Sequence, residues 1–261
     1  MAGPLHQFEI VPLSPSVDVV LPLIGRTTLA FTNSHLAMTV AFVLVVGFMM
    51  LVTSNAKVVP GRMQAVGETL FGMIDGVAQS IIGPEGKKLF PFVFTIFTFI
   101  LAMNLLGLFL FFTPTSQIAV TAFFGVITIL LVLCIGFAKH GLGFFKLFVP
   151  SGVPIFVLPF VVLIEFVSFL LRPMTLTLRL FGNMMGGHVA LKVFAGFVVT
   201  LGAMAMAGGF GLLGIPGAML SLSLVTGLTA LEFLVAFLQA FVFAVLTCIY
   251  LNDVVNLGHG H

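Results

Sequence analysis

The first half of the chain alternates between long apolar segments and short polar ones. Three apolar segments have about the 20 residues that a helix needs to cross a hydrocarbon layer of ~30 Å. Each is followed by a cluster of polar, charged or proline residues, which favours a turn. The pattern therefore predicts membrane-spanning helices at residues 35–55, 90–112 and 118–138.

The second half contains two apolar runs that are longer than an upright crossing needs. The run at 154–207 would be about 80 Å long as one helix, so it must either tilt strongly or split near Arg172–Pro173. The run at 218–252 is also long for an upright helix. A glycine-rich link at 208–217 joins the two runs, which predicts a hairpin of two tilted helices.

Two further segments differ in kind. Residues 1–32 contain four prolines, which exclude a long helix and favour an extended segment outside the bilayer. Residues 62–82 predict an amphipathic helix, which would lie at the membrane interface or pack against a partner helix. Its apolar stripe consists of Met63, Val66, Leu70, Met73, Val77 and Ile81.

These elements predict an all-α polytopic membrane protein with about five membrane helices and one interfacial helix. We expect three regions: residues 1–32 outside the bilayer, residues 33–149 with three spans and the interfacial helix at 62–82, and residues 150–261 with the hairpin.

Composition supports a lipid environment and sets an orientation. The 261 residues are 60% hydrophobic and only 7% charged, which is too few charges for a soluble domain. The net charge of +2 does not indicate nucleic acid as a partner, and Cys134 and Cys248 show no disulfide or metal spacing, so we expect neither a metal nor a cofactor. Lysine and arginine at 57–62, 87–88 and 139–146 would lie on the inner side, with the N-terminus and the turn at 113–117 outside.

The polar residues of the second half follow two helix faces. On the first long helix they recur at intervals of three or four, and on the last helix at multiples of seven. Ionisable groups are expensive in lipid, so they usually face a cavity, a partner or an ion path. The two faces can oppose one another in a hairpin. They consist of Glu165, Ser168, Arg172, Thr175, Arg179 and Asn183 on the first helix, and of Glu232, Gln239 and Asp253 on the last.

Protonation chemistry separates the roles of these side chains. Arginine stays charged, so Arg179 cannot relay protons, but it can hold or repel a mobile carboxylate. Glu232 and His188 can both titrate near neutral pH when partly buried. His188 lies nine residues from Arg179, on the opposite face of a regular helix. A fixed cation beside titratable side chains indicates a proton-translocating site. The alternatives are a structural ion pair of Arg179 with Glu165 or Glu232, and a helix-end anchor for Arg172.

Other classes of protein would show different sequence features. A self-contained secondary transporter often has internal repeats, and the two halves show none. An intramembrane enzyme would carry a motif such as H-E-x-x-H or G-x-S-x-G, and neither occurs. The segment GPEGKK is not a P-loop, so we expect no ATP site in this chain and no catalysis by the chain alone. A purely structural stator would not need the polar faces.

The block RPMTLTLRLFGNMMGGH, followed by LEFLVAFLQAFVFAVLTCIYL, resembles subunit a of F-type ATP synthases. The segments ILAMNLLGL, FTPTSQ and HQFEI extend the resemblance over most of the chain. The histidine precedes the acid, as in mitochondrial and related bacterial members.

The resemblance implies a role for each polar position. Arg179 corresponds to the essential stator arginine that faces a ring of small, carboxylate-bearing subunits. Protons would reach a ring carboxylate from the outer side and leave it toward the inner side. The outer path would comprise Glu232, His188 and Asn183, with Gln239 opposite the arginine, and the inner path Glu165, Ser168 and Asp253.

The resemblance also implies partners and a location. The partners would be the c-ring, the b-type subunits of a peripheral stalk, the other synthase subunits and the lipid bilayer. No segment typical of a transit peptide stands at the N-terminus, which favours the bacterial inner membrane over the mitochondrial one.

Overall fold

The computed structural model describes residues 11–13, 17–21, 25–54, 56–109, 113–149, 153–206 and 214–257. Its α-helices are α1 Asn33–Ser54, α2 Arg62–Ile82, α3 Gly86–Phe109, α4 Ile118–His140, α5 Leu158–Met206 and α6 Gly214–Val255. Two 3-10 helices, η2 Pro114–Ser116 and η3 Gly141–Phe148, flank α4, and the strands β1 Val17–Leu21 and β2 Gly25–Leu29 form an antiparallel hairpin. The segment HQFEI, most of the glycine-rich link and the C-terminal tail lie outside the described residues.

Five of the described segments are long and apolar enough to cross a membrane, and the all-α polytopic fold is confirmed. The three predicted spans of the first half correspond to α1, α3 and α4, which begin and end within a few residues of the predicted bounds. The placement of the N-terminal segment outside the bilayer and the three-region division stay predictions.

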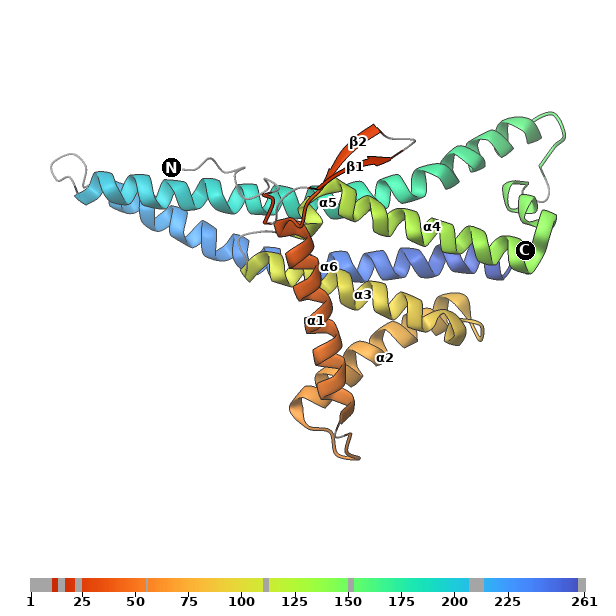
Figure 1. The fold of residues 1–261 in the computed structure, drawn as a ribbon, viewed down its shortest axis with the longest axis horizontal. Coiled ribbons are helices and arrows are strands. Elements are labelled where there is room, and N and C mark those ends of the chain that lie inside the picture. The colour runs from red at the N-terminus through yellow and green to blue at the C-terminus, as the bar shows by residue number, and fades with distance from the viewer. Residues whose placement is uncertain are drawn as a thin grey trace.

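The first long helix does not split. Helix α5 continues through Pro173 for 49 residues, which corresponds to about 73 Å. Proline removes one backbone hydrogen bond and is a common cause of kinks, and Figure 1 shows that α5 bends along its course. The helix is also regular from Gly182 to Gly187, so side chains keep the faces expected from a 3.6-residue period.

Helices α5 and α6 form the predicted hairpin, and its closed end projects beyond the other helices (Figure 1). The buried side chains of α6 concentrate from Glu232 onward, where α6 packs against α2, α3, α4 and α5. The core there contains large apolar side chains with no exposed surface, among them Phe97, Ile100, Phe243 and Leu251.

Helix α2 has the predicted bounds, but its most buried line is offset from the predicted stripe by one residue. That line is Gly67, Ile74, Ala78 and Ile82, and it packs against α1, α3 and α6. Met63 and Val66 of the predicted stripe are exposed. Gly67 and Ala78 of this line are small and allow close helix packing, which a hydrophobicity pattern does not register. The location of α2 at the membrane interface stays a prediction.

Side-chain hydrogen bonds to backbone carbonyls fix the position of α6. Asn104 of α3 donates to the carbonyl of Ala236 at 3.0 Å. A carbonyl can only accept, so His140 of α4 donates from Nε2 to Val254 at 3.0 Å. Asn256 donates to the carbonyl of Ile82 at 3.1 Å. These bonds connect α6 to α2, α3 and α4.

The contact between α4, η3 and α6 depends on the absence of a side chain at Gly136. A Cβ there would overlap the ring of Phe144 and a methyl group of Val254. We expect Gly136→Val to destabilise the chain by about 1–3 kcal/mol, because the added carbons overfill this contact. The measurement is thermal unfolding of the detergent-solubilised chain.

The control is Gly47→Val, the same substitution within α1. No described atom lies within 4 Å of a Cβ built at Gly47, so this variant should unfold at nearly the wild-type temperature. Equal destabilisation of the two variants would contradict the packing at Gly136.

Candidate functional site

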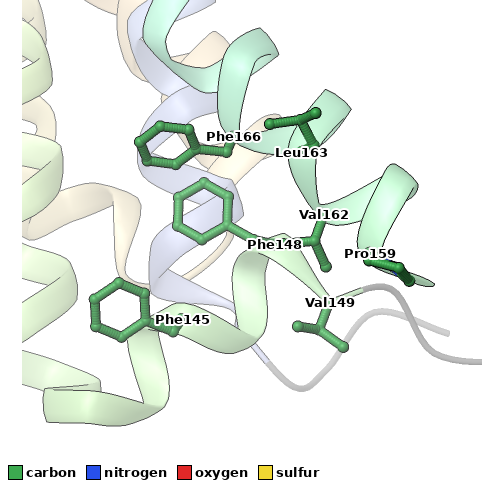
Figure 2. A pocket seen from close by; sticks show the side chains of 7 residues that line it. All are labelled: Phe145, Phe148, Val149, Pro159, Val162, Leu163 and Phe166. Atoms are coloured by element: carbon green, nitrogen blue, oxygen red, sulfur yellow. The ribbon is translucent and has the colours of Figure 1, made fainter. Parts of the chain in front are cut away.

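Two hollows on the described surface are lined by no ionisable group. One, of about 410 Å³, lies between η3 and the start of α5, and Figure 2 shows its apolar lining: Phe145, Phe148, Val149, Pro159, Val162, Leu163 and Phe166. The other, of about 400 Å³, lies between α1, α2 and α3. The polar side chains of the predicted site lie instead between α5 and α6.

Three polar pairs connect α5 and α6 in antiparallel register. Asn183 donates from Nδ2 to Oε1 of Gln239 at 2.9 Å. Toward one end of the hairpin, Nδ1 of His188 lies 3.6 Å from Oε1 of Glu232. Toward the other end, Nη1 of Arg172 donates to Oδ2 of Asp253 at 2.7 Å. The structure therefore places the three predicted polar residues of α6 beside polar residues of α5, and one of these, His188, lies outside the predicted polar face.

The pair of His188 and Glu232 is enclosed by protein. The exposed fractions are 7% for His188 and 3% for Glu232. A Cβ at Gly187 would overlap the carboxyl group of Glu232, so glycine at this position lets the acid approach α5. Among the described residues neither carboxyl oxygen of Glu232 has a hydrogen-bond partner, which leaves His188 as its nearest ionisable neighbour.

Arg179 has a different environment. Its side chain is exposed in the described chain, and no described carboxylate lies within salt-bridge distance. Glu165 lies near Arg172 instead, and Glu232 near His188, so the predicted alternative of a structural ion pair for Arg179 is wrong. The sequence predicts His188 and Arg179 on opposite faces of the helix, and their environments differ, because His188 is buried and Arg179 is exposed. The helix thus separates the fixed cation from the titratable pair.

The surface around Arg179 is open. Gly182 and Gly186 follow Arg179 at three and seven residues, so the three share a face with Asn183. A Cβ at either glycine would meet no described atom within 4 Å. The G-x-x-x-G pattern therefore makes no close helix contact within the described chain, and its surface is available to another chain.

Arg172 organises the opposite end of the site. Its guanidinium lies 5.1 Å from the ring centre of Tyr250 and 5.6 Å from that of Phe169, and Nη2 lies 3.9 Å from Oε1 of Glu165. With 20% of its side chain exposed, Arg172 is more enclosed than a helix-end anchor would be. Asp253 is therefore held by a cation, whereas Glu165 is only loosely paired. Ser168 is exposed and lies between Glu165 and Arg172 along α5.

Three residues of the site were not predicted from the sequence. Thr113 lies within hydrogen-bond distance of His188, Tyr250 stacks on Arg172, and Gly187 makes room for Glu232. Thr113 belongs to the polar turn at 113–117, and Tyr250 is the only tyrosine of the sequence. Their partners lie 75 and 78 residues away, so only the folded chain identifies them.

Comparisons with known proteins agree on one family. The family described as ATP synthase A chain matches residues 35–252. A protein of Rhizobium rhizogenes named ATP synthase subunit a is 51% identical over 260 residues, which cover 99% of each chain. Proteins of the same name from Chelativorans sp. and Rhizobium leguminosarum are each 50% identical and cover 98% and 99% of this chain.

The contact between Arg172 and Asp253 should contribute measurably to stability. We expect Arg172→Gln and Asp253→Asn each to destabilise the chain, because each leaves a partly buried charge without its partner. The double variant should lose less than the sum, with a coupling of about 1 kcal/mol. Thermal unfolding in detergent of the four proteins gives this coupling.

The ion pair of Lys88 and Glu85 provides the control cycle. Its atoms lie 3.5 Å apart, but its side chains are 77% and 44% exposed, so its coupling should be close to zero. If the effects of the Arg172 and Asp253 substitutions are additive, the contact between these two residues contributes nothing to stability.

Proposed function

This chain belongs to the ATP synthase A chain family, and from that premise we propose a path for protons along its last two helices. The family is the proton-translocating stator subunit of rotary ATP synthases, and this is the function of the chain. The comparisons give no support to the alternative of a self-contained secondary transporter.

The observation that carries the proposal is the uncompensated charge of Arg179. A permanent cation on a membrane helix is expensive unless it meets an opposite charge or water. The carboxylates of the described hairpin face other partners, so the counter-charge for Arg179 must come from elsewhere. We assign it to the carboxylates of a rotating c-ring, each of which passes Arg179 in its deprotonated form.

The face around Arg179 supports this assignment. Gly182 and Gly186 leave open surface beside the cation, and small residues allow the helix of another chain to approach closely. Ring helices that carry a carboxylate would fit this surface, with Asn183 and its partner Gln239 at the edge.

The path has two branches on either side of Arg179. The outer branch runs through Glu232 and His188, nine residues or about 13 Å along α5 from Arg179. The inner branch runs past Ser168 and Glu165, and Glu165 lies about 21 Å from Arg179 along α5. Asp253 belongs to the inner branch as the counter-ion that positions Arg172.

This arrangement couples proton flow to rotation. A proton that enters by the outer branch neutralises a ring carboxylate, which can then enter lipid. A proton can leave only after the ring has turned to the inner branch, because Arg179 blocks the direct route electrostatically. Each proton that crosses 100 mV supplies about 2.3 kcal/mol for this movement.

The chain is a membrane protein and part of an ATP synthase. We propose that its neighbours are the c-ring and b-type subunits of the peripheral stalk, and that it lies in the bacterial inner membrane. The bacterial sources of the similar proteins support this location over the mitochondrial inner membrane.

The test of the central assignment is Arg179→Ala in membrane vesicles that contain the whole synthase. Proton-driven ATP synthesis should fall below detection, because ring carboxylates lose their counter-charge and the two branches are no longer separated. The control is Arg62→Ala, which removes an exposed arginine at the start of α2 and should leave synthesis near the wild-type rate. Normal synthesis by Arg179→Ala would refute the assignment.

A further inference from the structure

The turn between α3 and α4 touches the titratable pair of the outer branch. Thr113 stands immediately before η2, and only 2% of its surface is exposed. Its Oγ1 lies 2.9 Å from Nε2 of His188, within hydrogen-bond distance. A Cβ at Gly107 would overlap Thr113, so the end of α3 leaves space for this side chain.

The hydroxyl of Thr113 has one proton and two candidate partners. Besides His188, Oγ1 lies 3.4 Å from the carbonyl oxygen of Gly107. A carbonyl can only accept a hydrogen bond, and donation of the hydroxyl proton to Gly107 leaves the oxygen of Thr113 as an acceptor for His188. The oxygen of Thr113 then accepts from His188, which requires a proton on Nε2.

A proton on Nε2 decides what the other ring nitrogen can do. A neutral imidazole carries one N–H, so Nδ1 has a free lone pair when Nε2 is protonated. That lone pair faces Oε1 of Glu232 at 3.6 Å. In the other tautomer Nδ1 already carries a proton and cannot accept one from the acid.

We propose that Thr113 is a positioning residue for proton transfer, which holds His188 in the tautomer that accepts a proton from Glu232. The O–H bond of Glu232 breaks and an N–H bond forms at Nδ1, which leaves a carboxylate beside an imidazolium. Nδ1 then releases this proton toward the ring carboxylate, while the other proton stays bonded to Nε2 and is donated in a hydrogen bond to the oxygen of Thr113. The proposal rests on the proposed outer branch through His188 and Glu232.

Burial makes the tautomer dependent on this one contact. Thr113, His188 and Glu232 all lie inside the protein, and Thr113 is the one described residue within hydrogen-bond distance of Nε2. Bulk water therefore does not compete for the hydrogen bond between Thr113 and His188. Loss of the Thr113 oxygen would let the single proton of neutral His188 move to Nδ1, where Glu232 is the nearest acceptor.

The experiment compares variants of Thr113 in vesicles that contain the whole synthase. Thr113→Val removes the acceptor with little change in volume, and Thr113→Ala removes it without any risk of overpacking. Both should lower proton-driven ATP synthesis about 100-fold, the lower end of the range for lost general acid–base assistance. Thr113→Ser restores the oxygen and should keep the rate within about twofold of wild type.

Thr128→Val is the matched control. Thr128 is equally buried, but its hydroxyl donates to the carbonyl of Phe124 in its own helix. Its removal should leave synthesis unchanged. Rates are normalised to the amount of assembled enzyme, so that poor assembly is not counted as slow proton transfer.

Nitrogen-15 NMR of histidine-labelled synthase reads the tautomer directly. The His188 signals, identified by their loss in His188→Gln, should show an unprotonated Nδ1 in the wild type and in Thr113→Ser. Thr113→Val and Thr113→Ala should shift Nδ1 toward the protonated form. A slower rate with an unchanged tautomer would show a merely structural role and would overturn the proposal.

Glu232→Gln separates this proposal from the function on which it rests. If Glu232→Gln stops synthesis while both Thr113 variants keep the wild-type rate, the outer branch stands and the role of Thr113 is refuted. If Glu232→Gln itself keeps the wild-type rate, the outer branch runs elsewhere and the proposed path is refuted.

Discussion

The uncompensated charge of Arg179 is the constraint on which the rest of the site depends. The other ionisable side chains of the site have a partner within the described chain: His188 faces Glu232, Arg172 holds Asp253 across the hairpin, and Glu165 lies near Arg172 on the same helix. A partner within the chain would neutralise Arg179 permanently and make it useless to a passing carboxylate. The antiparallel register avoids this, because the α6 segment between Gln239 and Asp253 contains no acid.

The remaining helices keep that register fixed. A shift of α6 by one turn would place its acids beside other residues of α5. The hydrogen bonds of Asn104, His140 and Asn256 connect the α6 segment to three neighbouring helices, one at Ala236 and two at its C-terminal end. Buried donors that lose such partners in an apolar environment are costly, so these bonds oppose sliding. The bundle around α6 therefore serves the alignment of charges as much as it buries apolar surface.

The sequence predicts much of the fold and less of the site, for physical reasons. Hydrophobic length and the 3.6-residue period are local properties, so the five apolar helices, α2 and the polar faces of α5 and α6 could be predicted. Which residues meet across the hairpin depends on the link between the helices and on packing with α2, α3 and α4. The ion pair of Arg172 with Asp253 and the contact of Thr113 with His188 arise at that level. The course of α5 at Pro173 also depends on packing, because proline permits either a break or a kink.

The contact with Thr113 gives the order of histidine and acid along the chain a structural meaning. His188 and Glu232 face each other, so an exchange of the two would still place an acid beside a histidine. Thr113, however, lies against the α5 position only. With an acid at that position, the oxygen of Thr113 could no longer accept from a ring N–H, and the histidine on α6 would lack this partner. The turn between α3 and α4 is therefore matched to a histidine on α5, and an exchange of the two residues would remove this contact.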